Sequence, residues 1–187
     1  MKVLSETAGL RLSLKLKDRL RADVAVFEQK ATPCSACETP GECCLDEHFV
    51  NVRISRLESV AIARVIDRLP PIKRAAVIEK IENSSSTLDH GRVSTFACPL
   101  YEKSSGCLVH NEAKPVPCIL HACYDRPEDL PPHELQDAAE LAIARLDRRV
   151  YGVPADLEPL PLAVQAAMLR TRKMNAITNP DRNQPAT

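Results

Sequence analysis

Apolar residues recur at steps of three or four along much of this chain, the spacing that places them on one face of a helix. In residues 10–30 the repeating positions are Leu12, Leu16, Leu20, Val24 and Phe27. Similar patterns predict helices over about residues 56–69, 72–82, 133–150 and 161–174. The chain is therefore expected to be mostly α.

Prolines and capping residues mark the ends of these helices. Ser55 and Glu58 have the S-x-x-E spacing of a capping box, which predicts the start of a helix. Pro70 and the proline after it are expected to end that helix, and the polar residues 83–87 are expected to form a loop. Residues 50–54 alternate apolar and polar side chains, which predicts a short extended segment.

Composition changes the picture of how this chain is held together. Aromatic residues make up only 3% of it and Trp is absent, so it lacks the large side chains that usually anchor long loops. Basic and acidic residues balance at 25 each, which gives no electrostatic footprint for nucleic acid or an anionic membrane. The N-terminus has no apolar signal-peptide core, and no stretch approaches the roughly 18–20 apolar residues of a membrane span. We therefore expect a cytoplasmic protein without nucleic-acid or membrane partners.

Eight cysteines are the strongest chemical feature of the sequence, and they fall into two blocks of four. Their spacing is Cys34-x2-Cys37-x5-Cys43-Cys44, then Cys98-Pro99-x7-Cys107-x10-Cys118-x4-Cys123. In a reducing compartment such blocks indicate metal or redox chemistry in preference to disulfides. A C-x2-C pair turns the chain so that two thiolates reach one ion. Adjacent Cys43 and Cys44 cannot easily point the same way, so Cys44 is the first that we would leave out of the ligand set.

The sequence leaves the identity of the metal open. Eight thiolates are enough for two tetrahedral zinc sites; alternatively, four hold an iron–sulfur cluster and the others hold a second metal or act in redox. A centre bound by four thiolates is negatively charged, so Lys103, Lys114 and Arg126 are expected near it. His110 and His121 are candidate ligands, although hydrogen bonding beside the centre is the favoured interpretation.

The joint pattern of the two blocks resembles the YkgJ-like (CxxCxxCC) family of zinc- or iron-chelating cysteine-cluster proteins. The resemblance covers about residues 33–126 and includes C-x2-C, the double cysteine, C-P-L and a basic-Pro step before the last two cysteines. It departs from the family in that five residues separate Cys37 from Cys43, and that His110 stands where relatives show Tyr. The resemblance implies metal ligands at Cys34, Cys37, Cys43, Cys44, Cys98, Cys107, Cys118 and Cys123.

These features predict four parts of the chain. They are an N-terminal helix at 1–32, a cysteine-cluster metal-binding domain at 33–126, C-terminal helices packing on it at 127–177, and a disordered tail at 178–187. The predicted fold class is mostly α, with helices framing two irregular cysteine-rich metal-binding loops.

The leading functional hypothesis is a cysteine-cluster protein that binds zinc or an iron–sulfur cluster, with the metal in a structural role. Two alternatives stay open. One is an iron–sulfur redox enzyme in which the cluster keeps an open coordination position. The other is a metal delivery or sensing protein whose thiolate pairs exchange metal with a partner. No catalytic residue and no cofactor beyond the metal is indicated.

Overall fold

The computed structural model describes residues 3–33, 36–46, 50–89, 95–103, 105–154 and 156–178. Within these ranges the chain is mostly helical, which confirms the predicted class. In chain order the elements are α1 Glu6–Glu28, α2 Glu42–Leu45, β1 Arg53–Ile54, α3 Arg56–Asp67, α4 Pro71–Asp89, β2 Tyr101–Glu102, β3 Gly106–Cys107, α5 Val116–Leu120, the 3-10 helix η2 Pro127–Asp129, α6 His133–Tyr151, β4 Glu158–Pro159 and α7 Leu160–Thr178.

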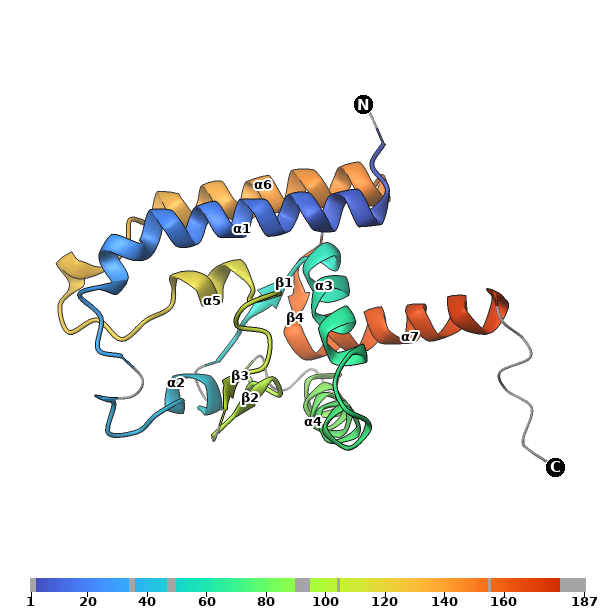
Figure 1. The fold of residues 1–187 in the computed structure, drawn as a ribbon, viewed down its shortest axis with the longest axis horizontal. Coiled ribbons are helices and arrows are strands. Elements are labelled where there is room, and N and C mark those ends of the chain that lie inside the picture. Colours follow the sequence, from blue (N-terminus) through green and yellow to red (C-terminus); the bar gives the residue numbers. More distant parts are fainter. Residues whose placement is uncertain are drawn as a thin grey trace.

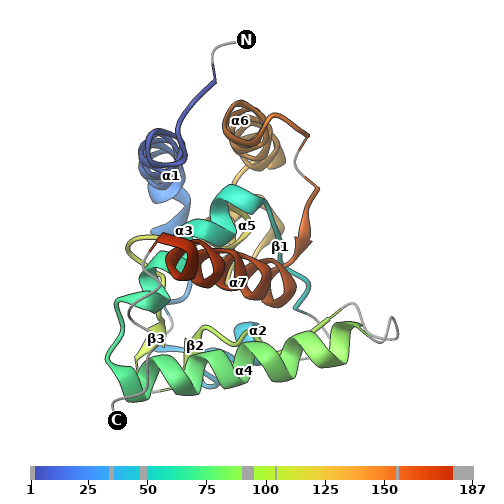
Figure 2. The same ribbon diagram turned by 90° about the vertical axis from the view of Figure 1, so that its right-hand side faces the viewer.

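Helices α1 and α6 form an antiparallel pair along one side of the molecule (Figure 1). Leu4, just before α1, donates its N–H to the carbonyl of Arg149 near the end of α6 at 2.9 Å. A side chain at Gly9 would collide with Val150, so the two helices approach each other closely there. Figure 2 shows this pair above α3 and α7, with α4 on the opposite side of α7.

The larger hydrophobic core lies between α3, α4 and α7. Its buried side chains include Ile66 of α3, Ile81 of α4 and Val164 of α7, and Leu100 and Val109 join it from the second cysteine block. Burying such a side chain contributes about 1.5–3 kcal/mol. Aliphatic packing therefore organises this part of the chain although aromatic residues are scarce.

A smaller core joins α1, α5 and α6. Its buried members are Leu20 and Val24 of α1, Val116 and Ile119 of α5, and Ile143 of α6, with Ala139 beside them. Because α5 also carries Cys118, this core fixes the backbone that presents one of the predicted metal ligands.

The buried face of α1 differs from the predicted one. Leu20 and Val24 are buried as expected, but Leu12 is 38% exposed and Lys17 is only 2% exposed. Apolar periodicity cannot identify this face, because Lys17 is buried by an ion pair with a carboxylate that is distant in sequence.

Residues 83–87 are helical, so the prediction of a polar loop there is wrong. Helix α4 continues to Asp89, and the hydroxyls of Ser86 and Thr87 donate to the carbonyl of Asn83 at 2.8 and 3.1 Å. Ile81 and Leu88 are both buried in the larger core. Tertiary packing therefore outweighs the weak helix propensity of Ser, Asn and Thr.

Other predicted elements are confirmed. The Ser55–Glu58 capping box is present at the start of α3, and β1 lies inside the predicted extended segment. β1 pairs antiparallel with β4, which ties the start of α3 to the start of α7. The predicted tail at 178–187 lies outside the described residues except for Thr178, the last residue of α7. Among the helices that the structure describes, none has the length and apolar character needed to cross a membrane.

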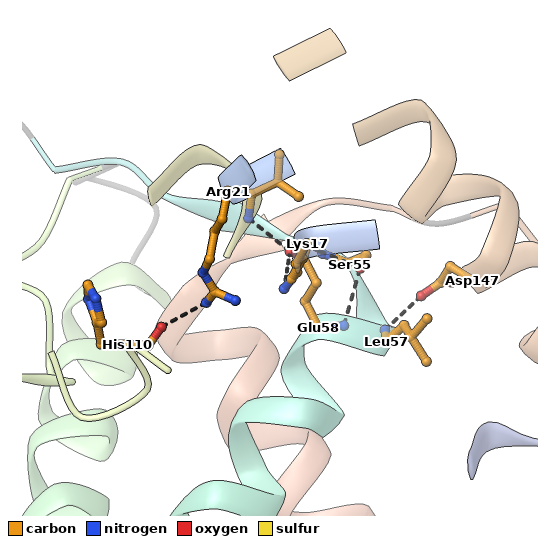
Figure 3. Close-up of polar contacts among 8 residues, drawn as sticks. Lys17, Arg21, Ser55, Leu57, Glu58, His110 and Asp147 are labelled. Atoms are coloured by element: carbon orange, nitrogen blue, oxygen red, sulfur yellow. Dashed lines mark hydrogen bonds and ion pairs between the residues drawn. The ribbon is translucent and has the colours of Figure 1, made fainter. Parts of the chain in front are cut away.

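The buried carboxylate of Glu58 joins three helices (Figure 3). It pairs with the Lys17 ammonium of α1 at 2.9 Å, and it accepts hydrogen bonds from the N–H and hydroxyl of Ser55 at 3.2 Å each. The N–H of Val116, at the start of α5, also donates to it at 3.1 Å. The Lys17 and Glu58 side chains are 2% and 5% exposed. We call these four residues the Glu58 network.

A second buried carboxylate ties α6 to the same region. Asp147 accepts the N–H of Leu57 in the first turn of α3 at 2.7 Å (Figure 3). An acidic group is favourable there, because the first N–H groups of a helix have no partner within the helix. Helices α1, α5 and α6 therefore all contact the N-terminal turn of α3 through polar groups.

Replacing Lys17 by Ala is expected to lower the free energy of unfolding by about 3–5 kcal/mol, because it leaves the Glu58 carboxylate buried without a counter-charge. Lys15→Ala removes an exposed lysine from the same helix and should change that free energy by less than about 0.5 kcal/mol. Urea unfolding followed by far-ultraviolet circular dichroism measures both variants. Equal effects from the two substitutions would show that the ion pair does not hold α1 on α3.

Candidate metal centre

Three cysteines of the second block lie on segments that meet beside the two cores. Cys98 precedes β2, Cys107 belongs to β3, and Cys118 lies in α5. β2 and β3 form a short antiparallel hairpin in which Cys107 is paired with Tyr101. Cys98 and Cys107 also pack against the larger core, which fixes the base of this hairpin.

The first block reaches the hairpin through α2. Cys43 and Cys44 lie on the single turn of α2, and the carbonyl of Cys44 accepts the N–H of Cys98 at 2.7 Å. Figure 1 shows α2 beside β2 and β3. The two cysteine blocks, although far apart in sequence, therefore meet at this point.

Four thiols form one group, with members from both blocks. Burial is the main cause that raises the pKa of Cys44, Cys98 and Cys118 to about 12, and neighbouring thiols in the group add to each of these shifts. Burial also raises the pKa of Cys107. Each of the four influences the pKa of another, and Cys43 is the thiol that adds most to that of Cys44, so these thiols share one neighbourhood. We call Cys44, Cys98, Cys107 and Cys118 the inner thiol group.

Backbone donors in the hairpin favour the thiolate form of two of these cysteines. Burial has the larger effect and raises the pKa of both thiols, whereas nearby backbone N–H groups, those of Leu100 and Tyr101 for Cys98 and that of Val109 for Cys107, lower it. The Tyr101 N–H itself donates to the Cys98 carbonyl at 3.2 Å. Backbone N–H groups arranged in this way are suited to support metal-bound thiolates.

One of the basic residues expected near the cysteines is in place. Burial is the largest influence on the pKa of Cys107 and Cys118 and raises both values. The ammonium of Lys114 lowers the pKa of both thiols. Arg126 instead pairs with Asp129, with 2.7 Å between Nε and Oδ2. Lys114 therefore supplies positive charge to the inner thiol group, and Arg126 stabilises the turn that follows the second block.

The candidate histidine ligands, His110 and His121, both have exposed side chains. The backbone carbonyl of His110 accepts a hydrogen bond from Arg21 of α1 at 2.8 Å (Figure 3). This contact joins the second cysteine block to α1 and does not involve the imidazole.

The remaining described cysteines line a cavity at the surface. Its volume is about 250 Å³, and the residues that line it are Cys37, Thr39, Gly41, Glu42, Cys43, Asp46 and Cys123. The N–H of Thr32 donates to the carbonyl of Cys123 at 2.8 Å, which brings the last cysteine beside the end of α1 and the first block. We call this cavity the outer thiol pocket.

The seven cysteines within the described ranges are all partly buried. Cys34, the other predicted ligand, lies outside these ranges. Among the described side chains, no three His, Cys, Asp or Glu residues are close enough together to hold a metal ion as they stand. The thiols of either site would therefore have to approach one another when a metal binds.

No family model, no curated protein and no solved structure matches this chain. The resemblance to the cysteine-cluster family thus rests on the sequence motifs alone. What the chain does is inferred from the placement of its own residues.

Gly41 holds the first cysteine block against the β2–β3 hairpin. It precedes α2 with a φ of +83°, a left-handed conformation that glycine adopts without strain. A side chain at this position would collide with the ring of Tyr101. Sequence reasoning missed this contact, because no local pattern links residues that are so far apart along the chain.

Gly41→Ala is expected to lower the free energy of unfolding by about 1–3 kcal/mol more than Gly152→Ala does, because only the first substitution adds a collision to the backbone strain. Gly152 is the matched control, since its φ is +81° and no atom lies within 4 Å of the position that a side chain would occupy. Urea unfolding of the two variants measures the difference. Equal losses would mean that the Tyr101 ring can move aside.

Proposed function

We propose that this chain is a metal-binding protein whose inner thiol group holds a zinc ion or an iron–sulfur cluster. The observation that carries the proposal is the convergence of four thiols from four segments: α2, the turn before β2, β3 and α5. Four thiolates are the full ligand set of a common type of structural zinc site and of common iron–sulfur clusters. The donor set suits either centre.

The chemistry of the inner thiol group supports this proposal. Burial and mutual repulsion raise the pKa of Cys98 and Cys118 to about 12, so each keeps its proton at neutral pH while no cation is near. A bound cation removes that repulsion, and the protons are released as metal binds. The backbone N–H donors of the hairpin and the Lys114 ammonium then support the thiolates.

A structural role for the metal follows from the way the cysteine segments are held. α2, β2, β3 and α5 are short, whereas the two aliphatic cores are built largely from the longer helices. A metal would draw these short segments together and order them. A reducing compartment such as the cytoplasm would keep the thiols available, and the resemblance to cysteine-cluster proteins points to the same function.

Cys118→Ser is expected to reduce the metal content from about one centre per chain to less than about a tenth, because a hydroxyl is a poor replacement for a thiolate ligand. Cys37→Ser changes a cysteine outside the inner thiol group and is the matched control, which should keep the centre. Elemental analysis and an ultraviolet–visible spectrum of protein purified without oxygen measure both variants. Zinc and no colour, or iron with labile sulfide and a brown colour, would identify the centre.

Two results would contradict the proposal. Wild-type protein that carries neither zinc nor iron after anaerobic purification would exclude a tightly held centre. Equal metal loss from Cys118→Ser and Cys37→Ser would mean that the inner thiol group is not a separate site. Circular dichroism of both variants distinguishes ligand loss from general unfolding.

Chelation of the metal is expected to raise amide hydrogen exchange in the cysteine segments, residues 36–46 and 95–120, and to change it little in α6 and α7. The reason is that these two helices are held by the aliphatic cores. Hydrogen-exchange mass spectrometry before and after chelation measures the effect. Uniform loss of protection would instead show that the metal holds the whole fold.

A further inference from the structure

Helix α6 has one side that packs on the molecule and an opposite side that is exposed. Ala139, Ile143 and Asp147 mark the buried side, and α6 contacts α1, α5 and α3. Figure 2 shows α6 beside α1 at the top of the view. Successive residues of a helix are about 100° apart, so positions three, four and seven apart share a side. The exposed side carries Glu134, Asp137, Ala138, Leu141, Arg145 and Arg148. We call these six residues the α6 outer face.

The charges of the α6 outer face are opposite on the two sides of its middle. Leu141 lies at the middle of the helix. Asp137 and Glu134 lie four and seven residues before it, and Arg145 and Arg148 lie four and seven residues after it. An alanine lies three residues from Leu141 on each side. A half-turn about an axis through Leu141 therefore exchanges each acidic position with a basic one.

The four charged side chains of this face form no ion pair within the part of the chain that the structure describes. Neither acidic residue has a basic one three or four positions further along α6, the spacing at which side chains of one helix pair. The helix dipole favours an acid in the first turn and a base in the last turn, which accounts for Glu134 and Arg148. It does not account for Asp137 and Arg145, which lie beyond those turns.

Leu141 adds an apolar centre to this charged face, and 52% of the residue is exposed. The alanines on either side of it are small, which lets a second helix approach closely. An apolar centre surrounded by a polar rim is the usual anatomy of a protein interface. The α6 outer face thus has the chemistry of an interface whose partner carries the same pattern in reverse.

We propose that the α6 outer face joins two copies of this chain, packed antiparallel about a two-fold axis at Leu141. In such an interface each residue meets the position equally far from the axis on the other copy. Leu141 packs on Leu141 of the partner subunit. Asp137 pairs with Arg145 of the partner subunit, and Glu134 pairs with Arg148 of the partner subunit. The inference does not depend on the metal centre, so it goes beyond the proposed function.

The interface is small, because one helix from each copy supplies it. Its ion pairs lie at the rim, where salt screens them. A reversible dimer that weakens as the salt concentration rises is therefore expected, in place of a permanent one. Arginine suits this role, because its planar guanidinium can hold a carboxylate through two hydrogen bonds.

Sedimentation equilibrium of the full chain, with a reductant present so that no disulfide links two copies, measures the association. The wild type is expected to reach twice the 20.6 kDa mass of one chain. Leu141→Asp places two carboxylates together on the axis and should weaken the dimer at least about a hundredfold. Leu169→Asp changes a leucine of α7 that is 51% exposed, and this matched control should leave the dimer unchanged.

Two charge-reversed variants test the antiparallel register. Glu134→Arg combined with Asp137→Arg makes the charges of the face all basic, and Arg145→Glu combined with Arg148→Glu makes them all acidic. Each variant should be monomeric by itself, because like charges meet across the axis. An equimolar mixture of the two should form a heterodimer, since every charged position then faces the opposite charge on the other copy.

Three outcomes would overturn the inference. The wild type would stay monomeric at low salt and at its highest soluble concentration. Alternatively, a wild-type dimer that Leu141→Asp leaves intact would use another surface. A mixture of the charge-reversed variants that stays monomeric would mean that these charges do not meet across a two-fold axis. Circular dichroism of every variant distinguishes lost association from unfolding.

Discussion

The buried carboxylate of Glu58 is the group on which the arrangement of the helices depends. A charge in this position is destabilising unless it is fully compensated, and its compensation comes from separate parts of the chain. Lys17 supplies the counter-charge from α1, Ser55 supplies the cap of α3, and Val116 supplies a backbone donor from α5. Because removing any one partner leaves the carboxylate poorly satisfied, the three helices are favoured in only one relative position.

This network also sets the position of the candidate metal centre. Cys118 follows Val116 by two residues within the same short helix, so the hydrogen bond to Glu58 fixes the backbone that presents its thiol. On the other side, Gly41 packs on Tyr101, and the Cys98 N–H bonds to the Cys44 carbonyl. None of these interactions uses a thiol side chain. The fold therefore brings the segments that carry these four cysteines together through contacts that do not involve the sulfurs.

The sequence was informative where structure is set by neighbouring residues and uninformative where it is set by distant ones. The capping box at Ser55 and the long helix that begins at His133 follow from local patterns, and both are present. The burial of Lys17 could not be predicted, because its reason is a carboxylate on another helix. The way the two cysteine blocks meet is also set by residues that are distant in sequence. Spacing suggested that Cys37 and its C-x2-C partner would share an ion and that Cys44 was the most dispensable ligand, and these remain predictions. What spacing could not indicate is the hydrogen bond from the Cys98 N–H to the Cys44 carbonyl, which joins the two blocks.

The double cysteine shows how a local rule and a distant contact combine. Successive side chains on an α-helix are about 100° apart, so Cys43 and Cys44 must face different surroundings on α2. The sequence indicates that the two side chains point different ways, but not which of them faces which part of the molecule. The turn that carries the pair is held against the hairpin by Gly41, which lies beside the Tyr101 ring, and by the hydrogen bond from the Cys98 N–H to the Cys44 carbonyl. Cys43 is then left in the wall of the surface cavity. One glycine thus helps to set how the double cysteine lies between the hairpin and the surface cavity.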